Sequence, residues 1–231
     1  MSAPRRPRPR ITIQYNIMYY RGENKNCYKR SNLPHRDRPG VRQSLTYRLW
    51  DSIPQSEALK IKQAIAHSHP DIKDYALRRY TEACLNRGYG SGLLKYPEIA
   101  KIVLSRWFEH NEKAYDLYEW IIMPNHVHLL FRPYPGYSLC DIMQSWKMQS
   151  GKLIRQTDIY RQIIQDYPDD MKQSVWDSDY FDREIRSDAH FHNMKKYIYN
   201  NPIGLKWNGQ IVERPEDWPF SSASTGWQSY F

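Results

Sequence analysis

The chain has 231 residues, a formal net charge of +9 and a hydrophobic content of 40%. This length fits one large domain or one domain with extensions, and the hydrophobic content is sufficient for a packed core. No apolar run approaches the length of a membrane span, and the basic first ten residues lack the apolar stretch of a signal peptide. These properties argue against a membrane-embedded or secreted protein, and we expect a cytoplasmic one.

The positive charge is concentrated near the N-terminus. Residues 1–43 contain eleven Lys and Arg against two Asp and Glu, whereas residues 44–231 contain 23 of each sign. A cationic segment on a neutral body favours a polyanionic partner, and the many tyrosines and tryptophans suit stacking on unpaired bases. A solubilising tail would explain the charge equally well. The candidate DNA-binding residues in this segment are Arg5, Arg6, Arg8 and Arg10.

The first predicted elements are a basic arm and strap at residues 1–43, followed by a strand at 44–50 with alternating side chains. Three helical patterns come next. Prolines open the first and the third, because proline is favoured in the first turn of a helix. The three patterns cover about 54–69, 71–87 and 97–108.

A hairpin is predicted next, with strands at 115–123 and 125–132 that meet at Pro124. Polar and apolar periodicity then indicates two longer helices joined by mixed segments. In chain order, we predict a helix at 138–156, a loop or short helix at 158–172, short strands at 175–185, a helix at 187–201 and an irregular stretch at 203–231. The pattern predicts a helix-rich α+β domain with an antiparallel sheet, and it permits a split βαβ arrangement of the ferredoxin type.

Two histidines, His126 and His128, lie in the apolar run from Glu119 to Phe131. Because side chains alternate along a strand, both imidazoles would face the same side. Two imidazoles on one face of a buried strand are half of a metal site, and burying them without a shared ligand would be costly. The alternative is one packed core histidine and one hydrogen-bonded histidine.

The helix at 187–201 offers the second half of such a site. Tyr197 is a candidate nucleophile, and Asn201, four residues later, is a candidate third metal ligand through its amide oxygen. Judged by spacing alone, an ordinary tyrosine and asparagine at the end of a helix explain the pattern slightly better. Candidate phosphate contacts, which a solvated helix face would explain equally well, are Lys147, Lys152, Arg155, Lys195 and Lys196.

Several short motifs follow one another in a specific order between Tyr28 and Ser224. They are Met-Pro-Asn-His-Val-His-Leu-Leu at 123–130, Trp176 with Tyr-Phe-Asp-Arg at 180–183 and Ile-Arg at 185–186, Tyr-Ile at 197–198 with Asn-Pro at 201–202, and Pro-Glu-Asp-Trp-Pro-Phe-Ser-Ser at 215–222. In this order they resemble the tyrosine transposases associated with repetitive extragenic palindromes (REP). That family belongs to the one-tyrosine HUH superfamily and is related to small insertion-sequence transposases that move as single strands.

The resemblance implies a ferredoxin-like fold with the histidine pair on a central strand, within an HUH catalytic domain at 44–202 and a C-terminal tail at 203–231. It implies His126 and His128 as ligands of Mg²⁺ or Mn²⁺ and Tyr197 as the nucleophile. Asn201 stands where relatives carry a polar third ligand, often Gln. The long helical stretch at 55–112 departs from the family pattern.

The implied activity is cleavage and transfer of single-stranded DNA at REP hairpins through a 5′-phosphotyrosine intermediate. The implied protein is a bacterial, cytoplasmic and nucleoid-associated monomer or homodimer. Two other functions remain open from the sequence. One is a regulator that binds DNA hairpins without cleaving them, and the other is a metal-dependent nuclease that hydrolyses single strands with water.

Overall fold

A four-stranded antiparallel sheet organises the computed structural model, which describes residues 38–66, 68–69, 72–165, 167 and 174–224. The strand order is β2-β3-β1-β4, so β1 and β3 occupy the centre. β1 pairs antiparallel with both β3 and β4, and β3 pairs antiparallel with β2. The strands are β1 (Gln43–Arg48), β2 (Tyr115–Ile122), β3 (His126–Pro133) and β4 (Phe181–Glu184).

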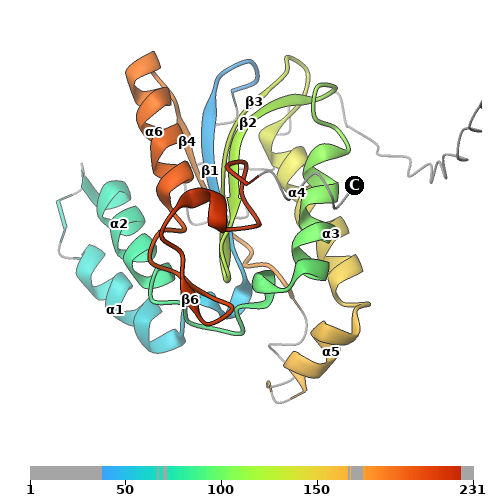
Figure 1. Ribbon diagram of the computed structural model, residues 1–231. Coiled ribbons are helices and arrows are strands. Elements are labelled where there is room, and N and C mark those ends of the chain that lie inside the picture. Colours follow the sequence, from blue (N-terminus) through green and yellow to red (C-terminus); the bar gives the residue numbers. More distant parts are fainter. Residues whose placement is uncertain (1–37, 67, 70–71, 166, 168–173, 225–231) are drawn as a thin grey trace, which may run out of the picture.

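Helices cover both faces of this sheet (Figure 1). The layer on one face holds α1 (Gln55–Ala66), α2 (Lys73–Leu85) and α6 (Asp188–Asn200). The layer on the other face holds α3 (Pro97–Phe108) and α4 (Leu139–Ile154), with α5 (Asp158–Ile164) following at its end. Among the described residues, no helix combines the length and the apolar character needed to cross a bilayer.

Local signals in the sequence set the starts of several helices. Ser138, Thr157 and Ser187 are the N-caps of α4, α5 and α6, and each side chain accepts a hydrogen bond from a backbone N–H in the first turn. Pro97 begins α3, where its missing N–H costs nothing. The predicted hairpin and the predicted helices at 138–156 and 187–201 are therefore confirmed, with ends that shift by one or two residues.

Aromatic side chains fill the space between the sheet and the α3–α4 layer. Trp107 donates a hydrogen bond from Nε1 to the hydroxyl of Tyr47 at 2.9 Å, and Trp146 donates one to the hydroxyl of Tyr115 at 3.1 Å. The Tyr115 hydroxyl in turn donates to the carbonyl of Trp107 at 2.7 Å. Every polar atom of this cluster thus has a partner inside the core, so the face is rigid as well as apolar.

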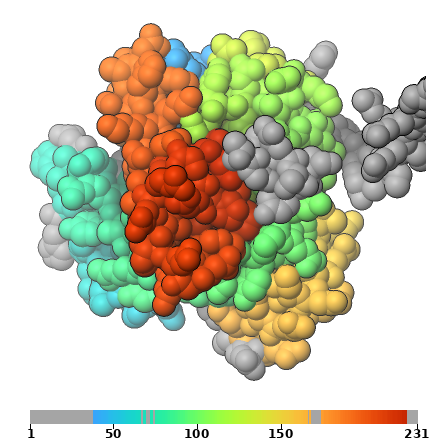
Figure 2. Space-filling model, viewed as in Figure 1, coloured from blue at the N-terminus to red at the C-terminus, as the bar shows by residue number. Residues whose placement is uncertain are grey.

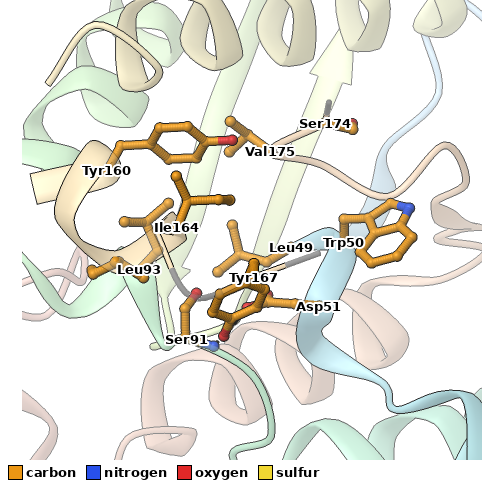
Figure 3. Close-up of a pocket in the computed structure, with 11 residues that line it drawn as sticks. Leu49, Trp50, Asp51, Ser91, Leu93, Tyr160, Ile164, Tyr167, Ser174 and Val175 are labelled. Carbon is orange, nitrogen blue, oxygen red and sulfur yellow. Dashed lines mark hydrogen bonds between the residues drawn. The ribbon is translucent and has the colours of Figure 1, made fainter. Parts of the chain in front are cut away.

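A small cavity lies where α5 meets the segment that follows β1 (Figure 3). Its volume is about 20 Å³, enough for roughly one water molecule. Asp51 closes one side by accepting hydrogen bonds from the hydroxyl of Tyr167 at 3.1 Å and from the N–H of Ser91 at 2.6 Å. The cavity itself is too small to admit a substrate.

The helical hairpin α1–α2 packs more loosely than the rest. No residue of α1 is fully buried, and Leu59 on α1 and Tyr75 on α2 are 54% and 60% exposed. A groove separates the hairpin from β1 and β4. The hairpin is therefore attached at the side of the domain and does not form part of its central core.

The C-terminal segment crosses the outer strand β2 and fills the front of the molecule in Figure 2. Trp218 donates a hydrogen bond from Nε1 to the carbonyl of Ile122 at 2.8 Å, and the carbonyl of Phe220 accepts one from the N–H of Ile122 at 2.8 Å. Both aromatic side chains are fully buried. A two-stranded hairpin, β5 (Lys206–Trp207) with β6 (Gln210–Ile211), precedes them in a stretch predicted to be irregular.

The predicted α+β class with an antiparallel sheet is confirmed, but the strands expected at 175–185 are reduced to β4. The cause is a local turn. The Asp177 carboxylate accepts a hydrogen bond from the N–H of Asp179 at 2.9 Å, which prevents extended pairing there. In the described stretch from residue 174 to β4, the sheet pairing is an isolated bridge between Leu49 and Trp176.

Candidate active site

The histidine pair lies on the central strand β3 with both rings on the α6 side of the sheet. His126 and His128 are 1% and 3% exposed, and their Nε2 atoms are 3.0 Å apart. The predicted arrangement of two imidazoles on one face of a buried strand is therefore confirmed. Two imidazole nitrogens this close, on one face of a buried strand, form a geometry that can hold a shared metal ligand.

Each ring is held in place through its other nitrogen. Nδ1 of His126 lies 2.7 Å from Oδ1 of Asn125, and Nδ1 of His128 lies 2.8 Å from the hydroxyl of Thr46. The Asn125 amide nitrogen donates to the carbonyls of Leu85 and Tyr89, which fixes its oxygen toward His126. His126 must then carry its proton on Nδ1, and its Nε2 offers a lone pair to the centre of the site.

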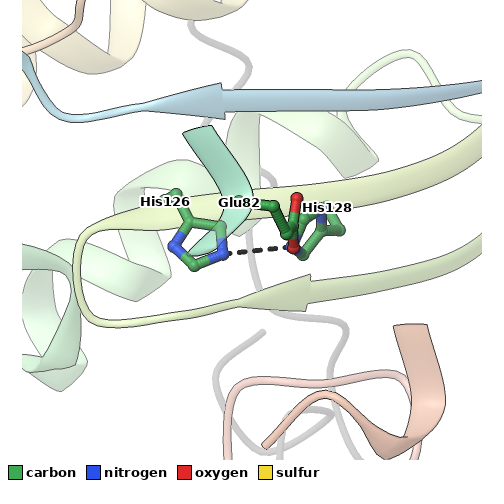
Figure 4. A group of neighbouring side chains, drawn as sticks. All are labelled: Glu82, His126 and His128. Atoms are coloured by element: carbon green, nitrogen blue, oxygen red, sulfur yellow. Dashed lines mark hydrogen bonds and ion pairs between the residues drawn. The ribbon is translucent and has the colours of Figure 1, made fainter. Parts of the chain in front are cut away.

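A carboxylate completes the group. Glu82 on α2 places Oε1 at 3.3 Å from Nε2 of His128, and one donor atom from each of Glu82, His126 and His128 lies within 4.8 Å of the others. Figure 4 shows the three side chains converging from α2 and β3. Sequence reasoning missed Glu82, because a single acidic residue on an amphipathic helix carries no motif that links it to a distant strand.

The predicted nucleophile meets the same group from α6. The hydroxyl of Tyr197 donates a hydrogen bond to Oε1 of Glu82, and its ring centroid lies 5.4 Å from that of His128. The residue is 39% exposed, so part of the ring faces solvent. The tyrosine and the histidines thus come together within a single chain.

The charges of the site follow from burial and proximity. Burial, followed by the charge of His128, lowers the pKa of His126 to about 3, so this imidazole is neutral at pH 7. Burial alone would raise the pKa of Glu82, but His128, Tyr197 and His126 together lower it to about 2. Burial, reinforced by the Glu82 charge, raises the pKa of Tyr197 well above its ordinary value. A neutral phenol therefore rests against a carboxylate anion.

Asn201 lies one turn after Tyr197, at the C-terminal cap of α6. The nearby Asn201 side chain acts to lower the pKa of the Tyr197 phenol and partly offsets its burial. Asn201 is therefore adjacent to the nucleophile, and its role as a metal ligand stays a prediction. Lys195 lies 3.5 Å from the buried carboxylate of Glu119, and Lys196 is exposed on α6.

The other predicted DNA contacts lie apart from this site. Lys147 and Arg155 line a cleft beside α4, in the layer on the opposite face of the sheet, and Lys152 is exposed on the same helix. The Nζ of Lys147 donates to the carbonyl of Ser178 at 2.9 Å, so this cation is partly engaged by the protein. The residues Arg5, Arg6, Arg8 and Arg10 lie outside the part of the chain that the structure describes.

The donor set fits a divalent metal ion. It combines neutral imidazole with a carboxylate anion, and it leaves room for oxygen ligands on the open Tyr197 side. Both imidazoles also carry hydrogen-bonded Nδ1 atoms, as histidine ligands of metals usually do. The donors alone do not select Mg²⁺, Mn²⁺ or Zn²⁺.

Comparison with known proteins places this geometry in a class. Residues 99–201 match the model of the family described as IS200-like transposase. The matched segment holds His126, His128, Tyr197 and Asn201 but begins after α2, so Glu82 lies outside it. The matched segment is less than half of the chain, and over it the chain is similar to the IS200-like transposase family.

The chain also has low-identity similarity to a REP-associated tyrosine transposase. It is 20% identical to the REP-associated tyrosine transposase of Escherichia coli (strain K12) over 111 residues, which are 48% of this chain and 56% of that protein. The match thus spans only about half the length of the curated relative. The solved structure described as the REP-associated tyrosine transposase bound to a REP hairpin matches with 14% identity and a TM-score of 0.47, over 83% of this chain and 82% of the other.

Proposed function

We propose that the protein is a metal-dependent DNA transesterase that cleaves single-stranded DNA beside REP hairpins and retains one strand end on Tyr197. The observation that carries this proposal is the meeting of a phenol, a carboxylate and two imidazoles inside one chain. The similarity of residues 99–201 to a transposase family and the likeness to a REP-associated enzyme support the substrate class. The order of the strands and the helices that separate them also support assignment to the ferredoxin-like folds.

We infer that His126, His128 and Glu82 hold Mg²⁺ or Mn²⁺, with Asn201 as the competing candidate for the third position. When bound, the ion supplies Lewis-acid polarisation of the scissile phosphate. The chain supplies the orientation, because Asn125 and Thr46 fix the two rings through their Nδ1 atoms. It also supplies negative charge through Glu82, whose lowered pKa keeps it ionised at pH 7.

The chemical step begins with the phenol oxygen of Tyr197, which attacks phosphorus. The bond from phosphorus to the 3′ oxygen breaks, and the product is a 5′-phosphotyrosine with a free 3′-hydroxyl. The hydrogen bond to Glu82 orients the phenol, its proton leaves to solvent as the new bond forms, and the departing 3′ oxygen takes up a proton from solvent. Because the phosphodiester is exchanged and not hydrolysed, a second 3′-hydroxyl can reverse the reaction and join a new strand.

The direct test is a search for the covalent adduct. The full chain is incubated with Mn²⁺ and a DNA hairpin that carries a randomised four-nucleotide flank and a fluorophore at its 3′ end, since the 3′ fragment would stay on the protein. We expect a labelled band that survives denaturation. The Tyr197→Phe variant should lose this band and still bind the hairpin.

Tyr199→Phe is the matched control, because Tyr199 lies on the same helix and donates its hydroxyl hydrogen bond to Glu216 instead of Glu82. This variant should retain the adduct. An adduct that survives in Tyr197→Phe would move the nucleophile. Hydrolysis without an adduct would favour the metal-dependent nuclease, and binding without cleavage would favour the regulator.

A further inference from the structure

A cleft extends from the proposed active site along the helical hairpin. Its volume is about 240 Å³, and it begins at His128 and Tyr197. Its walls are α2 and α6, and its floor is formed by β1 and β4. The side chain that marks its far part is Tyr75, near the start of α2.

The cleft is positively charged. Arg78, Arg79 and Arg183 line it, whereas its only lining carboxylate among the described residues is Glu82, which is engaged by His128 and Tyr197. Arg78 is anchored, since it donates to the carbonyl of Asp182 at 2.5 Å. Arg79 and Arg183 are exposed and form no ion pair with the part of the chain that the structure describes. An anionic occupant would satisfy them.

An exposed aromatic ring lies beside these cations. Tyr75 is 60% exposed, and the guanidinium of Arg79 lies 5.8 Å from the centroid of its ring. A ring that is open to solvent and flanked by cations suits a base with its neighbouring phosphates, because every base has a face for stacking. Bases within a duplex already stack on each other, so the ring favours an unpaired strand.

We propose that α2 forms one side of a channel for the unpaired strand next to the scissile phosphate. In this channel Tyr75 stacks on a base, and Arg79 and Arg183 contact phosphates. The inference rests on the proposed function, because the channel leads to Tyr197. Residues 73–85 precede the segment that matches the family model, so α2 and its cleft residues lie outside the matched part of the chain.

Binding measurements on the full chain test the channel. The parent protein is the uncleaving Tyr197→Phe variant, and the probes are a labelled pool of randomised 12-nucleotide single strands and a blunt hairpin with no unpaired flank. Adding Arg79→Gln or Arg183→Gln should reduce the slope of log K against log salt by about 0.7 per lost phosphate contact on the single strand. Adding Tyr75→Leu should weaken single-strand binding by roughly 5- to 100-fold.

Two matched controls separate these effects from misfolding and from loss of charge in general. Tyr75→Phe keeps the ring and should bind the pool like the parent. Lys101→Gln removes an exposed cation from α3, in the helix layer on the opposite face of the sheet, and should leave the salt slope unchanged. Blunt-hairpin affinity should stay constant in every variant.

The channel is refuted by any of three results: no binding of the pool by the parent, equal affinity in parent and variants, or an equal loss of affinity for the blunt hairpin. The adduct assay keeps this outcome separate from the proposed function. If the adduct forms but the channel variants bind the single strand like the parent, only the channel proposal is refuted. If the channel variants bind the single strand more weakly but the protein forms no adduct, the transesterase proposal is refuted and the channel proposal is supported.

Discussion

The two faces of the central sheet have opposite chemistry. Toward α3 and α4 the sheet presents a closed cluster of tryptophan and tyrosine side chains whose polar atoms bond to one another. Toward α2 and α6 it presents imidazole and hydroxyl groups, which meet the Glu82 carboxylate of α2 beside an open cleft. The difference shows that stability and chemistry are assigned to different sides of the same strands.

Alternation along β1 and β3 produces this division. In β3, Val127 and Leu129 point into the aromatic layer and His128 points away from it, while in β1 the same alternation separates Tyr47 from Thr46. Thr46 and His128 are register partners, so the hydroxyl reaches the ring directly. A one-residue slip would exchange the two faces, and the aromatic layer prevents that slip.

The largest expected change in folding free energy comes from the aromatic face. Trp107→Ala should lower the free energy of unfolding by about 3–5 kcal/mol, because it leaves a cavity and removes the donor to Tyr47. Urea unfolding measures the loss. Trp107→Phe is the control and should cost clearly less. A Trp107→Ala protein with unchanged stability would contradict the role given to this face.

The next effect concerns the active-site face. His128→Ala should reduce the rate of adduct formation by about 10²-fold or more, since it removes a ligand and the partner of Glu82. Its free energy of unfolding should fall far less than that of Trp107→Ala. Initial rates and urea unfolding on the same preparation give both numbers. A His128→Ala protein that cleaves at the parent rate would exclude the histidine pair from the chemistry.

Metal binding should stabilise the folded chain by about 2.7 kcal/mol when free Mn²⁺ is one hundred times its dissociation constant. The reason is that Glu82, His126 and His128 come together only in the folded state. Thermal unfolding with Mn²⁺ and with a chelator measures the gain. Glu82→Gln should reduce it, and Asn201→Ala should leave most of it. The reverse order would assign the third ligand to Asn201.

The smallest effect is a dependence of stability on pH in chelator-treated protein. In the unfolded chain His126 binds a proton below about pH 6.5, whereas in the folded chain its pKa is about 3. The unfolded state is therefore favoured as pH falls, by up to roughly 1.4 kcal/mol per unit. Glu82, with its pKa lowered to about 2, adds in the same direction below pH 4.5. Urea unfolding between pH 7 and 5 should show a shallower slope for His126→Leu, and an equal slope would contradict the shift.

Much of this division could be predicted from the sequence, because it depends on local periodicity. Alternation gave the shared face of His126 and His128, and the serine cap with its helical spacing gave the helix that carries Tyr197. Glu82 could not be predicted, since its place depends on how α2 packs across the sheet. The turn at Asp177, which leaves β4 shorter than predicted, depends on a side chain that competes with backbone pairing.

The central claim is that the phenol of Tyr197 attacks the DNA beside the imidazole pair. The most direct measurement is mass spectrometry of the protease-digested DNA adduct, with fragmentation that assigns the nucleotide remnant to one residue. We predict the remnant on Tyr197, in the parent protein and in Tyr199→Phe alike. A remnant on Tyr199 or on any other residue, or cleavage of the strand with no remnant on the protein, would contradict the account.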